Sequence, residues 1–170
     1  MLTKDGRTVA LRPVRVEDAA TMIRAVDAVA REGRWFLRGS FDLTIEEETE
    51  YIAGLGPEKG AMIVAEVEDE IVGWVTIGRG RAEFVRHTAE LGLGVARDYR
   101  GVGIGAALMK EAIAWARSTG IEKLCLGVRA DNVVARSLYE KMGFIQEGYQ
   151  QRHIKTPEGY EDILLMARFL

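Results

Sequence analysis

Seven stretches of the chain have the apolar patterning and the flanking turn residues that are typical of β-strands. They cover residues 7–12, 61–67, 71–78, 86–95, 124–128, 149–156 and 160–169. The acidic turn Glu68-Asp69-Glu70 joins the second stretch to the third, and Pro157-Glu158-Gly159 joins the last two. The pattern therefore predicts a sheet in which two of the connections are hairpins.

Four further stretches place apolar residues three and four positions apart, which is the spacing of a helix with one buried face. They cover residues 17–30, 44–55, 103–118 and 132–141. Thr44 and Glu47 form a capping box at the start of the second helix, while Gly33 and Gly120 follow the first and the third. The order of elements, in which antiparallel strands precede a strand–helix–strand crossover, indicates a mixed α/β fold.

Composition and charge restrict the classes of function. The chain has 170 residues, of which 48% are hydrophobic and 29% are charged, so we expect one soluble domain over residues 1–170. The net charge of −3 provides no basic field for nucleic acid, and no segment is apolar enough to span a membrane. We therefore expect a cytoplasmic protein with neither a nucleic-acid nor a membrane partner. The sequence is compatible with a homodimer.

Cysteine and histidine contribute little chemistry. Cys125 is the single cysteine, which excludes an internal disulfide, and its position in an apolar strand predicts that it fills space there. His87 and His153 make no metal-ligand pattern with each other or with nearby acidic residues, so we assign no metal.

A glycine triplet before the third helix is the strongest chemical signal in the chain. An apolar strand from Leu91 to Val95 leads through a charged turn to Gly101, Gly103 and Gly105, which lie at alternate positions. Glycine lets the backbone bend tightly and approach a ligand closely, and a helix N-terminus offers unpaired amides to an anion. These residues therefore predict a cradle for a diphosphate.

Two familiar diphosphate sites fit this stretch poorly. The phosphate-binding loop of nucleoside triphosphatases needs a lysine and a hydroxyl residue after its last glycine, whereas Ala106 and its two successors are apolar here. The dinucleotide fingerprint is formally matched by Gly101, Gly103 and Ala106. However, a charged turn separates the strand from the first glycine, and Glu122 precedes its strand instead of ending it.

The segment from Arg100 to Gly105 fits the coenzyme A motif Q/R-x-x-G-x-G/A of the GNAT superfamily, the general N-acetyltransferases. Downstream, Asn132, Tyr139 and the pair Gly143-Phe144 reproduce the family's spacing N-x6-Y-x3-G-F. The chain resembles this family over roughly residues 62–169. The resemblance implies the GNAT fold, in which the sheet splays open in a V after the strand ending at Val95. Gly92 and Gly94 suit the bulge that such a splay needs.

The resemblance also implies acetyl-CoA as the cosubstrate and assigns residues to it. The pantetheine arm would lie along Leu93, Gly94 and Val95, whose free amides could polarise the thioester carbonyl. The pyrophosphate would lie in the cradle, which consists of Arg100, Gly101, Val102, Gly103, Ile104, Gly105 and Ala106. Arg100 would add positive charge at the mouth of the cradle.

Asn132, Ala135 and Tyr139 lie on one stripe of the fourth helix, because residues seven apart are separated by two turns. In the family, the asparagine touches the pantetheine arm and the tyrosine hydroxyl acts as general acid beside the sulfur. Small Ala135 would let the coenzyme pass. Without the family resemblance, the sequence would be interpreted as placing Asn132 at a helix N-cap and Tyr139 in the core.

Glu90 is the candidate general base. Ribosomal-protein N-terminal acetyltransferases carry a glutamate where this chain has Gly127, whereas amino-acid and phosphinothricin-type enzymes resemble it at Glu90. The sequence therefore favours direct transfer of acetyl to the primary amine of a small molecule such as an amino acid. A protein N-terminus and a non-catalytic role as a CoA-binding regulatory module are the alternatives. Residues 34–41, with three aromatic side chains, and the last hairpin would surround the acceptor or anchor the core.

Overall fold

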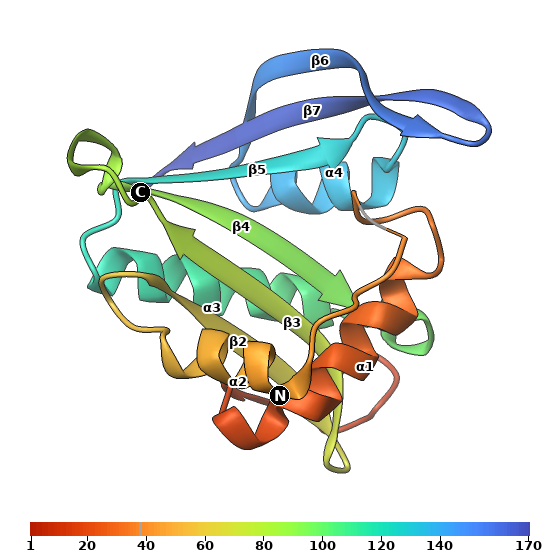
Figure 1. The fold of residues 1–170 in the computed structure, drawn as a ribbon, viewed down its shortest axis with the longest axis vertical. Helices are drawn as coiled ribbons and strands as arrows, with labels where there is room; N and C mark the ends of the chain where they lie inside the picture. The colour runs from red at the N-terminus through yellow and green to blue at the C-terminus, as the bar shows by residue number, and fades with distance from the viewer. Residues whose placement is uncertain (38) are drawn as a thin grey trace.

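The computed structural model describes residues 1–37 and 39–170, and it folds these into one sheet with helices on both faces (Figure 1). The strands are β1 Ala10–Pro13, β2 Gly60–Val67, β3 Glu70–Arg79, β4 Thr88–Val95, β5 Lys123–Arg129, β6 Ile145–Thr156 and β7 Gly159–Phe169. The helices are α1 Ala19–Ala30, α2 Ile45–Ala53, α3 Ile104–Ser118 and α4 Val133–Lys141, with short 3-10 turns between some elements. In Figure 1, α1 and α2 lie in front of β2 and β3, while α3 lies behind them.

The strand order β1-β2-β3-β4-β5-β7-β6 places β4 and β5 at the centre of the sheet. Every neighbouring pair is antiparallel except β4 and β5, which are parallel. The parallel pairing ends at Glu90 and Cys125, although both strands continue for several residues beyond it. The sheet therefore opens as a V between β4 and β5 (Figure 1). The predicted mixed sheet and its splay are confirmed, and the splay begins within β4.

The predicted bulge at Gly92 and Gly94 is wrong. β4 pairs with β3 in one unbroken register from Ala89 to Val95. Both glycines are instead required by packing, because a Cβ on Gly94 would lie 2.3 Å from the Trp74 ring and one on Gly92 would lie 2.6 Å from Thr76 Oγ1. The absence of a side chain at these two positions leaves room for the Trp74 ring and the Thr76 hydroxyl of β3.

The starts of two strands differ most from the sequence prediction, and the other strand ends move by no more than two residues. The first strand begins at Ala10, because Thr8 pairs with Leu2 in a separate turn of the N-terminal segment. β6 begins at Ile145 and not at Tyr149, since its first two residues pair with β7 before a register shift around Gly148. The predicted helices and the capping box of Thr44 and Glu47 are observed, with ends that move by a few residues.

The buried residues form two clusters, one on each face of the sheet. The larger cluster joins α3 and α4 to the inner strands and includes Ile104, Leu108 and Tyr139. The smaller cluster joins α1 to β2 and β3 and includes Met22 and Trp74. Both faces of β2 and β3 are therefore covered, whereas Gly127 and Leu165 on the other arm of the sheet are exposed.

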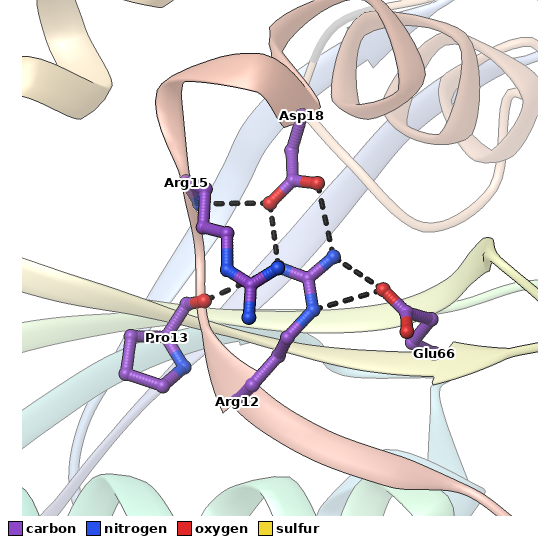
Figure 2. Close-up of polar contacts among 5 residues, drawn as sticks. All are labelled: Arg12, Pro13, Arg15, Asp18 and Glu66. Carbon is purple, nitrogen blue, oxygen red and sulfur yellow. Dashed lines mark hydrogen bonds and ion pairs between the residues drawn. The ribbon is translucent and has the colours of Figure 1, made fainter.

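A compact ion cluster ties the edge of the sheet to the start of α1 (Figure 2). Arg12 on β1 donates to both carboxylate oxygens of Asp18, at 2.6 and 2.9 Å, and to Glu66 on β2. The backbone N–H of Arg15 also donates to Asp18, at 2.7 Å. These contacts fix the turn that leads into α1, and they lower the pKa of Asp18 below its ordinary value of 3.8.

Asp18→Asn should lower the free energy of unfolding at pH 7 by about 1–3 kcal/mol, because it removes the charge that strengthens these hydrogen bonds. A lowered carboxyl pKa stabilises the fold above the ordinary pKa and ceases to do so as pH falls through the folded-state pKa. Urea denaturation should therefore show a difference between parent and variant that shrinks as pH is lowered below 3.8, the ordinary pKa of the carboxyl group. Glu158→Gln, at an exposed turn residue, is the control and should show no such difference.

Candidate active site

The predicted cradle is the turn between β4 and α3. Gly101 and Gly103 have φ of 77° and 104°, in the left-handed region, and Gly103 is the N-cap of α3. The first intrahelical hydrogen bond of α3 runs from the Ala107 N–H to the Gly103 carbonyl. The four preceding N–H groups, from Gly103 to Ala106, therefore lack partners within the helix and point out of its N-terminus.

Space for an anion lies in front of these amides. A Cβ built on Gly101 or on Gly103 would meet nothing within 4 Å. Gly105 differs, since a Cβ there would lie 3.3 Å from Leu138 of α4, so this glycine serves the packing of α3 against α4. Val102 and Ile104 point inwards and pack on the larger core cluster. The turn therefore exposes its backbone while its side chains anchor it.

Arg100 has a partner that the sequence did not reveal. Its guanidinium donates to both carboxylate oxygens of Glu32 at the end of α1, at 2.8 and 2.6 Å, and its Nε donates to the Val95 carbonyl. Arg100, with Trp35 donating a further hydrogen bond, lowers the pKa of Glu32 to about 2. The negative charge of Glu32 therefore offsets the positive charge of Arg100. The role of Arg100 at the cradle stays a prediction.

The open edge of β4 carries free backbone groups. The Ala96 N–H donates to the Val72 carbonyl of β3, and antiparallel alternation then turns the N–H groups of Leu91, Leu93 and Val95 away from β3. The Leu91 N–H lies within the parallel pairing of Glu90 with Cys125, whereas the N–H groups of Leu93 and Val95 face the gap that opens between β4 and β5. The amides expected for a pantetheine arm near Leu93 and Val95 are thus exposed without a bulge, and Gly94 keeps the strand close to Trp74.

α4 lies beside this edge. Leu138 of α4 approaches the position of Gly105, which also has Leu93 and Val95 within 4 Å of its would-be Cβ. Asn132 is the N-cap of α4 and accepts a hydrogen bond from the Ala135 N–H at 3.1 Å, so the capping interpretation is correct. A second role for the Asn132 amide nitrogen, and the role of Ala135, stay predictions.

Tyr139 is almost completely buried, with 7% of its surface exposed, and its ring lies 6.0 Å from that of Phe144. The core interpretation of its ring is therefore correct. Within the described residues its hydroxyl has no hydrogen-bond partner, and burial raises its pKa to about 12. The hydroxyl thus stays protonated through the physiological range, which is the state that a proton donor needs.

Glu90 lies at the fork of the V, in the last residue pair before β4 and β5 separate. Its side chain is exposed, and no described residue forms a hydrogen bond or an ion pair with its carboxylate. Strand alternation places its side chain on the same face as Gly92 and Gly94, which is the face of Trp74 and α1. Its role as general base stays a prediction.

Gly127, on the opposite arm of the V, is exposed and its packing does not demand glycine. A Cβ there would lie 3.4 Å from Ile163 and 4.0 Å from Leu165, which is ordinary contact. A Cβ at this position would therefore displace no neighbour, so the fold does not explain why a glycine stands here.

The segment after α1 is held by residues that sequence reasoning did not identify. Phe36 packs on Trp74, with ring centroids 6.1 Å apart, and Trp35 packs on the same core cluster. Arg129, the last residue of β5, donates to the carbonyls of Gly33 and Phe36. Both aromatics are thus core anchors. Leu37 is exposed, and Arg38 in this segment lies outside the described residues.

The hairpin of β6 and β7 contains an irregularity between Gln150 and Ile154. Arg152 has φ of 54° there, and its guanidinium lies 5.1 Å from the Tyr160 ring. Its N–H and the Tyr149 hydroxyl both donate to Asp162. The hairpin therefore has a fixed basic and aromatic surface, whose part in acceptor binding stays a prediction.

No group of three or more His, Cys, Asp and Glu side chains among the described residues could hold a metal ion. No helix in that part of the chain is long and apolar enough to cross a membrane.

Comparisons with known proteins agree with this geometry. The chain is 37% identical over 70 residues to the ribosomal protein bS18-alanine N-acetyltransferase of Escherichia coli (strain K12), across 41% of the chain and 47% of that relative. It is 31% identical over 110 residues to an L-amino acid N-acetyltransferase of the same strain, across 62% of the chain and 66% of that relative. The match thus spans about half the length of the first of these relatives.

Solved structures and a family model extend the match. The crystal structure of an acetyltransferase of the GNAT family from Streptococcus pneumoniae superposes with a TM-score of 0.91 at 30% identity, covering 96% of this chain and 100% of that one. The model of the acetyltransferase (GNAT) family matches residues 27–144, which is more than half of the chain. With a splayed sheet and a glycine cradle at the expected places, the chain belongs to the GNAT acetyltransferase family.

Proposed function

We propose that this chain is an acetyl-CoA-dependent N-acetyltransferase that acetylates the primary amine of a small molecule, such as an amino acid, by direct transfer in a ternary complex. The observation that carries the proposal is that the cradle, the open edge of β4 and α4 lie together, since the would-be Cβ of Gly105 has Leu93, Val95 and Leu138 of α4 within 4 Å. α4 also carries the buried Tyr139, whose hydroxyl is protonated.

The residues at the cradle fit the coenzyme. The open space at Gly101 and Gly103 and the four amides of α3 suit a pyrophosphate, and the helix dipole favours its negative charge. The N–H groups of Leu93 and Val95 would bind the amide oxygens of the pantetheine arm. When bound, acetyl-CoA supplies the thioester from which the acetyl group is transferred.

Tyr139 and Glu90 would handle the two protons of the reaction. A free amine is mostly protonated near pH 7, so a base must accept a proton before the amine can attack. Glu90 is an exposed carboxylate at the fork of the V, on the acceptor-facing side of β4. Tyr139 would donate its hydroxyl proton to the sulfur as the C–S bond breaks, and the second proton that the nitrogen loses on forming the amide would restore the phenol.

The similarity to the L-amino acid enzyme supports a small acceptor, whereas the similarity to the ribosomal-protein enzyme supports a protein N-terminus. Gly127 favours the small acceptor, because the carboxylate of the ribosomal-protein type is missing. A CoA-binding regulatory module would keep the cradle but would transfer nothing.

A thiol-release assay tests the proposal. Purified protein and acetyl-CoA are mixed with a panel of amino acids, polyamines, aminoglycosides and N-terminal peptides, and free CoA thiol is measured. We expect release above background with at least one amino acid. Release with peptides alone would favour the protein N-terminus, and CoA binding without any release would favour the regulatory module.

Gly103→Val is the negative control of this assay, because a branched side chain would fill the anion space and disturb the bend. Its affinity for CoA, measured by calorimetry, should fall at least about a hundredfold. Gly120→Val is the matched variant. Gly120 also has a positive φ and open space around its would-be Cβ, but it lies at the other end of α3. Equal losses in both variants would mean that backbone strain alone is responsible.

Tyr139→Phe should leave the affinity for acetyl-CoA unchanged, because the ring still fills its place beside Phe144. Turnover should fall by roughly 10²–10⁴, as is typical when a general acid is lost. Steady-state kinetics and CoA titration measure the two quantities separately. A variant with the turnover of the parent would leave Tyr139 a purely structural residue.

Glu90→Gln keeps the shape of the side chain and removes the base. Its rate should be depressed near neutral pH and should recover as pH rises towards the pKa of the acceptor amine, because solution then supplies the neutral nucleophile. The pH–rate profiles of parent and variant provide the comparison. Identical profiles of equal magnitude would show that the proton goes to another residue or to bulk water.

A further inference from the structure

Residues 32–36, named here the strap, follow α1 and reach both arms of the V. In Figure 1 the orange segment after α1 runs towards the end of β5 and the start of α4, across the open side of the gap between β4 and β5. Hydrogen bonds to Arg129 on β5 and to Arg100 beyond β4 agree with this path. The strap thus spans the part of the V that the sheet leaves open.

The first end of the strap is tied to the β4 arm. Glu32 binds Arg100 through two hydrogen bonds and accepts a third from Trp35 Nε1 at 2.6 Å. Arg100 in turn holds the carbonyl of Val95, the last residue of β4. Such a bidentate, charge-assisted pair fixes geometry as well as distance.

The other end is tied to the β5 arm by Arg129, of which only 7% is exposed. Arg129 donates to the carbonyls of Gly33 at 3.3 Å and of Phe36 at 3.1 Å, and it forms an ion pair with Glu161 of β7 at 2.8 Å. Its Nε has no partner among the described residues. A buried guanidinium is costly to desolvate. That of Arg129 donates hydrogen bonds from two of its nitrogens to the strap.

The strap also borders the face of β4 on which Glu90 lies. Phe36 packs on Trp74, and Trp74 covers Gly94 on that face of β4. An amine that approaches Glu90 from the same face must enter beside this aromatic pair. A shift of the strap would therefore change the walls of the acceptor space while leaving the N-terminus of α3 in place.

We propose that Arg129 is a positioning residue that holds the strap across the V and thereby sets the affinity for the acceptor amine. The acceptor role rests on the proposed function, whereas the tie between Arg129 and the strap does not. Arg129 acts through the carbonyls of Gly33 and Phe36, so it need not touch the substrate itself.

The test uses the double variant Arg129→Met/Glu161→Met. Removing both partners leaves no unpaired buried charge, so the fold should survive. Arg12→Met is the control for a general loss of stability, since it leaves the partly buried carboxylates of Asp18 and Glu66 without their arginine but lies on the outer strand β1. Amide hydrogen exchange of residues 33–37, the KM for the acceptor and the Kd for acetyl-CoA are measured for all three proteins.

In the double variant, exchange at residues 33–37 should accelerate at least about tenfold, because the carbonyl contacts that order the strap are lost. The KM for the acceptor should rise about tenfold or more through misplacement of the strap, while the Kd for acetyl-CoA should change less than about twofold. The Arg12→Met control should show neither the faster exchange in the strap nor the higher KM.

If hydrogen exchange in the strap is unchanged in the double variant, Arg129 does not hold the strap, and the proposal is overturned whatever the enzymatic activity is. Faster exchange with an unchanged acceptor KM would overturn the positioning role. An equal rise in KM in Arg12→Met, or a parallel rise in the Kd for acetyl-CoA, would show a general loss of stability and overturn it as well. If the parent protein acetylates no amine, the proposed function fails together with the acceptor role, and the exchange data alone decide on the tie.

Discussion

The early end of the pairing between β4 and β5 is the constraint on which the rest of the structure depends. Parallel strands that stayed paired to their ends would satisfy each other's backbone groups and leave nothing for a ligand. Here pairing stops at Glu90 and Cys125, and the free N–H groups of β4 face a gap. The cradle, α4 and the strap all lie around that gap (Figure 1). The candidate site thus consists mainly of backbone N–H groups that have no partner in the sheet, and few side chains contribute to it.

The local parts of this arrangement were predictable from sequence. The cradle depends on backbone conformations that Gly101 and Gly103 adopt with positive φ, and on a helix that begins directly after them. The Thr44–Glu47 capping box and the Asn132 cap are likewise contacts between residues three apart. Signals of this kind are contained within a short window and are visible without the fold.

The non-local parts were not predictable. Gly92 and Gly94 looked like bulge residues because the side chain that excludes a Cβ at Gly94 belongs to Trp74 on another strand. Arg100 looked like a free cation because Glu32 precedes it by 68 residues. The contacts of Arg129 with the strap left no signal in the sequence, since its partners there are backbone carbonyls. In each case the deciding contact joins segments whose proximity only the sheet order creates.

The long span of the strap contacts also bears on how the chain acquires its shape during synthesis. Arg129 follows Phe36 by 93 residues, and Glu161, which pairs with Arg129, lies on the last strand. Loop-closure entropy makes such contacts late events, and β6 and β7 emerge from the ribosome after all the other elements described. A nascent chain that already contains the cradle therefore still lacks the contacts that complete the strap. Premature termination before β7 would leave a protein with the proposed coenzyme cradle encoded but the proposed acceptor side unassembled.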